Sequence, residues 1–147
     1  MNNTTVDEKI DILRKTCAEK GMRVTPQRIE IYKYVANSCE HPSAETIFEA
    51  VKKQMPNVSI DTVYRTLASL EELGIIFRVD NQLPKARFDA DLTPHNHFLC
   101  IQCGEVYDIF PESYDLEIPK ESYTFGQVKD ANLQVRGICN KCLKANK

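Results

Sequence analysis

Two pairs of cysteines, each with two residues between its members, constrain this chain more than any other feature of its sequence. Cys100 and Cys103 form the first pair, and Cys139 and Cys142 form the second. A C-x2-C spacing lets two thiolates from one tight turn reach the same ion, and four thiolates satisfy the tetrahedral preference of Zn²⁺. Gly104, directly after the first pair, would relieve the turn. We therefore expect a structural Zn²⁺ site with no open coordination position for chemistry.

The same spacing also occurs in redox motifs and in disulfide frameworks. Thioredoxin-like motifs lie where a strand meets a helix, whereas these pairs lie beside predicted strands. Disulfides are typical of exported proteins, and the N-terminus lacks the basic patch and apolar stretch of a signal peptide. No apolar run approaches the roughly 20 residues that span a bilayer. We expect a cytoplasmic protein without a membrane segment; the roles of Cys17 and Cys39, unpaired by spacing, stay open.

The first half of the chain has the periodicity of helices. Apolar residues recur every three or four positions from Val6 to Cys17, and Gly21 would end that helix. Three further helices are predicted to begin at hydroxyl-bearing N-caps, because a side-chain oxygen there accepts a hydrogen bond from a free backbone N–H group. These N-caps are Thr25, Ser43 and Ser59.

Two short strands are predicted to follow the fourth helix. Gly74 would end that helix, and residues 75–79 and 86–88 have the composition of strands. Asp80, Asn81 and Pro84 would form the turn between them. Several helices followed by a β-hairpin is the order of elements in a winged-helix domain.

The sequence therefore predicts an α+β fold with two domains. An N-terminal winged-helix domain would span residues 1–87, a hinge residues 88–94, and a second domain residues 95–147. In the second domain, strands are predicted at 97–101, 105–109 and 133–138. The segment 110–125 contains two prolines and is compatible with either a short helix or a loop.

All three histidines of the chain are candidate metal ligands, together with two aspartates. His95 and His97 alternate just before the first cysteine pair, so on a strand they would share one face, with Asp108 across the same hairpin. Asp89 lies at the predicted hinge, and spacing alone cannot bring His41 to the others. If the five meet, three imidazoles and two carboxylates suit Fe²⁺, Mn²⁺ or Zn²⁺. A role as ordinary surface residues is an equally open reading of the alternating histidines.

The predicted fourth helix has a polar face that could contact DNA. Its outward side chains would reach base edges and phosphates in a major groove. They are Thr62, Tyr64, Arg65 and Ser69, and Arg28 is a candidate phosphate contact. The net charge of −2 means that DNA affinity must come from basic groups placed on one face. A solvated helix face without a DNA role fits the same pattern.

Five segments, taken in order, resemble the ferric uptake regulator family. They are HPSAETIF, DTVYRTLASLEELGII, RFD, HNHFLCIQCGEVYDI and GICNKC, and TPQR at 25–28 fits as well. The resemblance covers roughly residues 10 to 142. It implies a winged-helix DNA-binding domain and a C-terminal α/β dimerisation domain with a four-cysteine Zn²⁺ site. It also implies a homodimeric repressor that binds palindromic, double-stranded operator DNA. The ligands of its regulatory metal would be His41, Asp89, His95, His97 and Asp108.

Two of those ligands point to one branch of the family. Iron-uptake regulators usually carry glutamate at the positions of Asp89 and Asp108, whereas peroxide-responsive members carry aspartate. The chain thus resembles the peroxide-responsive branch, which implies repression with Fe²⁺ or Mn²⁺ bound and Fe²⁺-dependent oxidation of ligating histidines. His41 and His95 would be the oxidation targets, and loss of the metal would release DNA. An iron- or zinc-responsive metal-uptake regulator of the same family is the alternative.

The chain departs from the family pattern at residues 130–133. Many members have a histidine there that serves an additional metal site, so we expect that site to be absent or incomplete. An enzyme, such as a metal-dependent hydrolase or a thiol oxidoreductase, is not expected. No nucleophile is paired with a base, and five protein ligands would leave little room for substrate. Metal-dependent binding to a palindrome would exclude a third reading, a zinc-ribbon module that binds no DNA.

Overall fold

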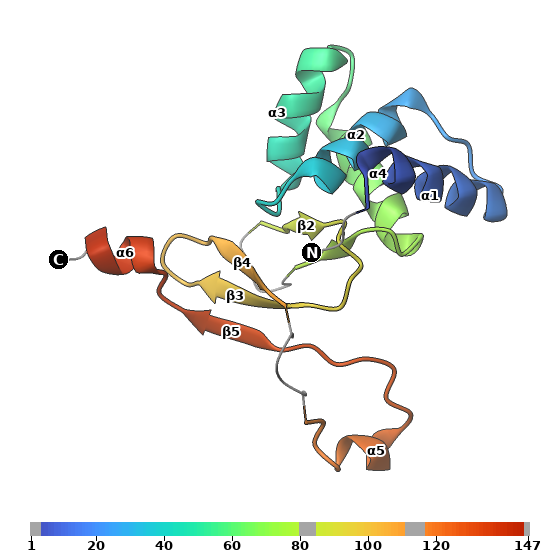
Figure 1. Ribbon diagram of the computed structural model, residues 1–147. Helices are drawn as coiled ribbons and strands as arrows, with labels where there is room; N and C mark the ends of the chain where they lie inside the picture. Colours follow the sequence, from blue (N-terminus) through green and yellow to red (C-terminus); the bar gives the residue numbers. More distant parts are fainter. Residues whose placement is uncertain (1–3, 80–84, 111–116, 146–147) are drawn as a thin grey trace. The chain divides into compact units, whose positions relative to one another are not determined.

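The computed structural model describes residues 4–79, 85–110 and 117–145 (Figure 1). They belong to two compact units, Asn2–Leu92 and Thr93–Lys147. The first unit is mainly helical and the second is built on a β-sheet, which confirms the predicted α+β class. Within the described ranges, no helix combines the length and apolar character needed to cross a membrane.

Four helices make up most of the N-terminal unit. They are α1 (Val6–Glu19), α2 (Pro26–Asn37), α3 (Ala44–Gln54) and α4 (Ile60–Glu72). Each begins at a residue whose hydroxyl oxygen accepts a hydrogen bond from the backbone N–H three positions later. Thr5 is the first of these N-caps, and the other three are the predicted Thr25, Ser43 and Ser59. Gly74 follows α4 with a φ of +75°, which glycine adopts without a side-chain clash.

One hydrophobic core joins the four helices. Its members repeat every three or four residues along each helix, as in α4, where Val63, Leu67 and Leu70 are at most 1% exposed. Cys17 also belongs to this core, in agreement with the periodicity of the first helix. Phe48 of α3 and Met55, which follows that helix, are only partly buried and pack against the edge of this core.

A small antiparallel hairpin follows α4, and we call it the wing. Its strands are β1 (Phe77–Arg78) and β2 (Phe88–Asp89), with Phe77 opposite Asp89. The predicted turn residues, Asp80, Asn81 and Pro84, lie outside the described residues. The order of four helices and a hairpin is the one predicted for a winged-helix domain. The loop before α3 lies along the wing, because the Phe88 N–H donates to the carbonyl of Pro42 at 3.1 Å.

The C-terminal unit contains a three-stranded sheet with the order β4-β3-β5. The strands are β3 (Asn96–Cys100), β4 (Val106–Ile109) and β5 (Gln134–Gly137). β3 is antiparallel to β4 and parallel to β5, and Figure 1 shows the arrows of β3 and β5 pointing the same way. Two short helices, α5 (Ser122–Phe125) and α6 (Asn140–Ala145), complete the described elements. α5 lies in the segment that the sequence left open between helix and loop, of which 111–116 are outside the described residues.

Candidate metal centres

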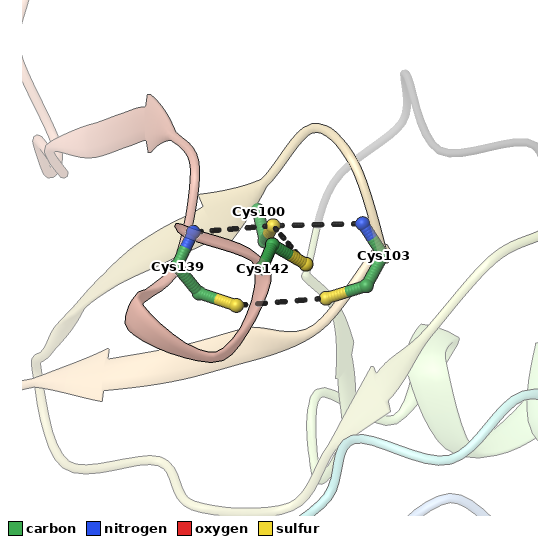
Figure 2. A group of neighbouring side chains, drawn as sticks. All are labelled: Cys100, Cys103, Cys139 and Cys142. Carbon is green, nitrogen blue, oxygen red and sulfur yellow. Dashed lines mark hydrogen bonds between the residues drawn. The ribbon is translucent and has the colours of Figure 1, made fainter. Parts of the chain in front are cut away.

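The four paired cysteines lie together in the C-terminal unit (Figure 2). The Sγ atoms of Cys100 and Cys142 are 3.9 Å apart, and those of Cys103 and Cys139 are 3.8 Å apart. Thiolates bound to one tetrahedral ion at about 2.3 Å are separated by about 3.8 Å. A disulfide would bring two sulfurs to about 2.05 Å. The cluster therefore has the spacing of a tetrahedral metal site and not that of two disulfides.

The parallel pairing of β3 with β5 brings the two cysteine pairs to one end of the sheet. Cys100 is opposite Gly137, two residues before Cys139, and the Ile101 N–H donates to the Gly137 carbonyl at 2.8 Å. Cys100 is the last residue of β3, and Cys103 lies in the turn to β4. Cys139 directly precedes α6, and Cys142 lies in its first turn. Sequence spacing predicted each pair, and the strand register explains how the two pairs meet.

Hydrogen bonds from two backbone amides lower the pKa of one of these thiols, that of Cys100. The N–H groups of Cys103 and Cys139 donate to Cys100 Sγ at 3.5 and 3.3 Å (Figure 2). These hydrogen bonds lower the pKa of the Cys100 thiol to about 6. Burial raises the pKa of Cys142 to about 12. A coordinating cation would override that difference, because a metal-bound thiol is deprotonated.

Tyr107 on β4 also contacts the cluster, although no sequence pattern singled it out. Its side chain hydrogen-bonds to Cys139, which raises the pKa of Tyr107 to about 12. The Cys142 backbone N–H and then the Tyr107 hydroxyl lower the pKa of the Cys139 thiol. Tyr107 and Cys139 also line a common cavity of about 460 Å³. Alternation along the strand could have predicted only the face of the sheet on which Tyr107 lies.

Three of the predicted regulatory ligands form a second group in the C-terminal unit. Asp108 lies across the hairpin, as predicted, and the register places it directly opposite His97. Asp108 Oδ1 is 3.3 Å from Nε2 of both His95 and His97. His95 Nδ1 is 2.6 Å from the carbonyl oxygen of Thr93. An N–H at Nδ1 donates to that carbonyl, which leaves Nε2 as the ligating atom. Two imidazoles and one carboxylate are a donor set suited to a divalent cation.

The other two predicted ligands form a pair in the N-terminal unit. His41 Nε2 is 3.2 Å from Asp89 Oδ2, so a loop residue and a wing residue provide one imidazole and one carboxylate. Among the described residues, His41 is the one non-glycine residue with positive φ, at 53°. Such a backbone costs on the order of 1–3 kcal/mol and is found mainly at functional sites. The following Pro42 disfavours it further.

The predicted DNA contacts of α4 lie on its outer face. Arg65 and Tyr64 are exposed, and Tyr64 retains 47% of its accessible surface. The Tyr64 hydroxyl donates to Glu45 Oε1 of α3 at 2.5 Å, which lowers the pKa of Glu45. A neighbouring helix thus fixes the direction of the Tyr64 side chain.

The remaining predicted DNA contacts make local hydrogen bonds. Thr62 Oγ1 is 2.9 Å from Ser59 Oγ, and Ser69 Oγ donates to the Arg65 carbonyl at 3.0 Å. Arg28, in the first turn of α2, donates through Nη1 to the carbonyl of Arg23. Each of these bonds joins residues that are close in the sequence, at most five positions apart.

Known proteins share both the sequence pattern and the fold. Residues 19–136 match the model of the Ferric uptake regulator family. The chain is 31% identical over 138 residues to the peroxide-responsive repressor PerR of Staphylococcus aureus (strain USA300), covering 93% of this chain and 90% of that protein.

Solved structures extend the comparison to the fold. The ferric uptake regulator Fur of Helicobacter pylori aligns with a TM-score of 0.76 at 22% identity, over 97% of both chains. PerR of Streptococcus pyogenes aligns with a TM-score of 0.51 at 29% identity, over 88% of this chain and 90% of that chain. Proteins of this family are metal-dependent transcriptional regulators and not enzymes. A family match over most of the chain, with the expected elements and the four-cysteine cluster, shows that this protein belongs to the ferric uptake regulator family.

Proposed function

We propose that this protein is a metal-dependent repressor that senses hydrogen peroxide and binds a palindromic operator as a homodimer. The observation that carries the proposal is the identity of the carboxylates beside the histidines. Asp89 lies 3.2 Å from His41, and Asp108 lies 3.3 Å from His95 and His97. Iron-uptake regulators of the family usually carry glutamate at both positions. The similarity to the S. aureus repressor PerR supports the same assignment.

We further propose that one divalent ion, Fe²⁺ or Mn²⁺, takes its ligands from both groups. Nitrogen and oxygen donors of this kind suit such ions. The proposed ligands are His41, Asp89, His95, His97 and Asp108. They belong to the proposed domains 1–87 and 95–147 and to the hinge 88–94, so binding would restrict the motion of one domain against the other. Release of the ion would remove that restriction.

Peroxide sensing would reside in the histidine side chains. Fe²⁺ held by these ligands would activate hydrogen peroxide at the site, and the histidine would supply the two electrons that reduce the peroxide. In the net reaction a ring C–H of His41 or His95 becomes C–OH, and the second peroxide oxygen leaves as water. An oxidised imidazole is a poorer ligand, so the site would lose affinity for metal and the protein would release DNA. A Mn²⁺-loaded protein should repress but respond poorly to peroxide.

The four cysteines are proposed to hold a structural Zn²⁺. Their sulfur spacing fits a tetrahedral ion, and four thiolates leave no position for substrate. The Zn²⁺ would join the β3–β4 turn to the start of α6.

DNA recognition is proposed to use the outer face of α4 and to require two protomers. Thr62, Tyr64, Arg65 and Ser69 would contact the major groove, and Arg28 a phosphate. Large apolar side chains exposed on the C-terminal unit support an association surface there. They are Tyr123, Phe125, Leu133, Ile138 and Leu143.

Mass spectrometry of the iron-loaded protein tests the proposal. Zinc-containing protein would be loaded anaerobically with Fe²⁺ or Mn²⁺, treated with hydrogen peroxide and digested. We expect one added oxygen in peptides containing His41 or His95 for Fe²⁺ only, together with release of operator DNA in a gel-shift assay. Asp89→Glu and Asp108→Glu keep the charge and should retain metal-dependent DNA binding with less oxidation. Unoxidised histidines in iron-loaded protein that binds its operator would favour the metal-uptake alternative.

A further inference from the structure

Arg87, the residue before β2, reaches the loop that carries His41. Its Nη2 donates to the carbonyl of Glu40 at 2.6 Å, and its Nε donates to the carbonyl of His41. A guanidinium can hold two adjacent carbonyls because its N–H donors have a fixed, planar arrangement. One side chain therefore binds the backbone on both sides of the His41 peptide nitrogen.

Main-chain hydrogen bonds attach the same loop to the same strand. The Phe88 N–H donates to the Pro42 carbonyl at 3.1 Å, and Ser43 forms an isolated antiparallel bridge with Arg87. Residues 40–43 thus run beside the wing strand, held by the backbone at one end and by the Arg87 fork at the other. His41 lies within this fastened segment.

The conformation of His41 requires such support. Its φ of 53° is one that side-chain-bearing residues rarely adopt, and a residue before proline prefers extended backbone. Relaxation to an extended backbone would turn the imidazole away from Asp89 Oδ2, which is now 3.2 Å away. Arg87 directly precedes β2 and forms a bridge with Ser43, so it continues the extended backbone of that strand. Arg87 and Asp89 are two residues apart along this extended backbone, so their side chains leave it on the same face. A single strand provides both the carboxylate for the His41 side chain and the hydrogen bonds for its backbone.

We infer that Arg87 is a positioning residue for the regulatory metal site: by holding Glu40 and His41 to β2, it aims the His41 imidazole and links metal binding to the wing. The inference rests on the proposed role of His41 as a ligand. Arg87 is joined to the other strand of the wing by a backbone hydrogen bond, because the Val79 N–H donates to the Arg87 carbonyl at 3.0 Å. Metal binding should therefore slow hydrogen exchange of the Val79 and Phe88 amides, and this effect should depend on Arg87.

Two measurements on the full-length, zinc-containing protein test the inference. Mn²⁺ affinity is measured by titration, and exchange of the Phe88 amide is followed by NMR with and without Mn²⁺. We expect Arg87→Ala to weaken Mn²⁺ binding roughly tenfold to a hundredfold, the usual effect of losing a group that orients a ligand. The Phe88 amide should exchange faster in this variant even without Mn²⁺. Arg87→Lys should also weaken binding, because an ammonium cannot reproduce the fork.

Two control variants separate this inference from the proposed function. Arg78→Ala removes another wing arginine, whose Nε lies 2.8 Å from Glu71 Oε2, and it should leave Mn²⁺ affinity unchanged.

His41→Ala tests the proposed ligand itself. If His41→Ala weakens Mn²⁺ binding and neither Arg87 variant does, the positioning role of Arg87 is overturned while the ligand set stands. If His41→Ala leaves Mn²⁺ binding intact, the proposed ligand set fails, and Phe88 exchange alone then decides whether Arg87 fastens the loop. If Arg87→Ala does not fold, Arg87→Lys decides the question. The inference is overturned if Arg87→Lys has the Mn²⁺ affinity and the Phe88 amide exchange rate of the wild type.

Discussion

At Gly137, near the end of β5, the ring of Phe98 occupies the space that a side chain would fill. A Cβ at this position would lie 3.1 Å from Phe98 Cζ and 3.2 Å from Cε2. Gly137 pairs with Cys100 and precedes Cys139 by two residues, so its backbone helps to bring the two cysteine pairs together. The absence of a side chain therefore allows the strand and the ring to pack closely, and Phe98 lines a common cavity with Cys139.

Gly137→Ala is expected to destabilise the C-terminal unit by about 1–2 kcal/mol, because the Phe98 ring must shift to accommodate the new methyl group. Gly126→Ala is the matched control: its backbone is extended and its added Cβ meets nothing within 4 Å. We expect that control to change stability by less than about 0.5 kcal/mol. Urea unfolding of the zinc-loaded variants measures both free energies. Equal effects at the two glycines would contradict the packing argument.

Residue types with strong chemical preferences were predictable, and residues that act through long-range geometry were not. The C-x2-C spacing identified the four cysteines, and alternation with the hairpin pattern placed Asp108 across the hairpin from the two histidines. The contact of Tyr107 with Cys139 depends on strand register, which the sequence does not specify. The hydrogen bonds of Arg87 to the carbonyls of Glu40 and His41 depend on the left-handed backbone of His41, which no sequence pattern predicts.

Among the elements, α4 offers the clearest test of DNA recognition. Its inner residues pack in the core, and Arg65 projects from the other side into solvent. We expect Arg65→Ala to lower operator affinity by about fivefold to 150-fold, because it removes a base or phosphate contact of about 1–3 kcal/mol. The thermal stability of Arg65→Ala should match that of the wild type, because the substitution removes only an exposed side chain that lies outside the core.

Salt dependence and a second variant show whether the effect belongs to this helix. Loss of a phosphate contact would reduce the slope of log affinity against log salt by about 1, whereas loss of a base contact would mainly relax sequence preference. Lys144→Ala removes the same charge from α6 and should leave operator affinity nearly unchanged. If both variants lose affinity equally, the effect comes from net charge and α4 is not the recognition element.

Elements with local signals were predicted well from the sequence. The N-caps Thr25, Ser43 and Ser59 start α2, α3 and α4 because capping is settled within three residues of the chain. α6 has six residues and no capping signature, so no sequence argument predicted it. Short helices of this kind depend on tertiary contacts, here those of the cysteine pair at its start with Cys100 and Cys103.

At the scale of the whole molecule, the two units differ in how they are stabilised. The N-terminal unit has a continuous core from Leu13 to Ala90. In the described part of the C-terminal unit, buried apolar side chains are few: Leu99 and Val106, with Cys100 and Cys139 of the cluster. A small core of this kind usually needs a metal or a partner subunit for stability.

The order of helices before strands was predictable from the change in periodicity. The contact of His41 with Asp89 was not, because spacing says nothing about contacts over such a sequence separation.

This difference predicts selective unfolding when the four-cysteine site is lost. Cys139→Ser should eliminate bound zinc and unfold the C-terminal unit, because ligand binding and folding are coupled in small metal-dependent units. The four long helices all belong to the N-terminal unit, so helical circular dichroism should fall little, while trypsin should cleave after Arg136 and Lys141. Cys39→Ser changes an exposed cysteine outside the cluster and should retain both zinc and protease resistance. Zinc content and mass spectrometry of the digests measure these outcomes. A zinc-free Cys139→Ser protein as resistant to trypsin as the wild type would mean that apolar packing alone holds the sheet together.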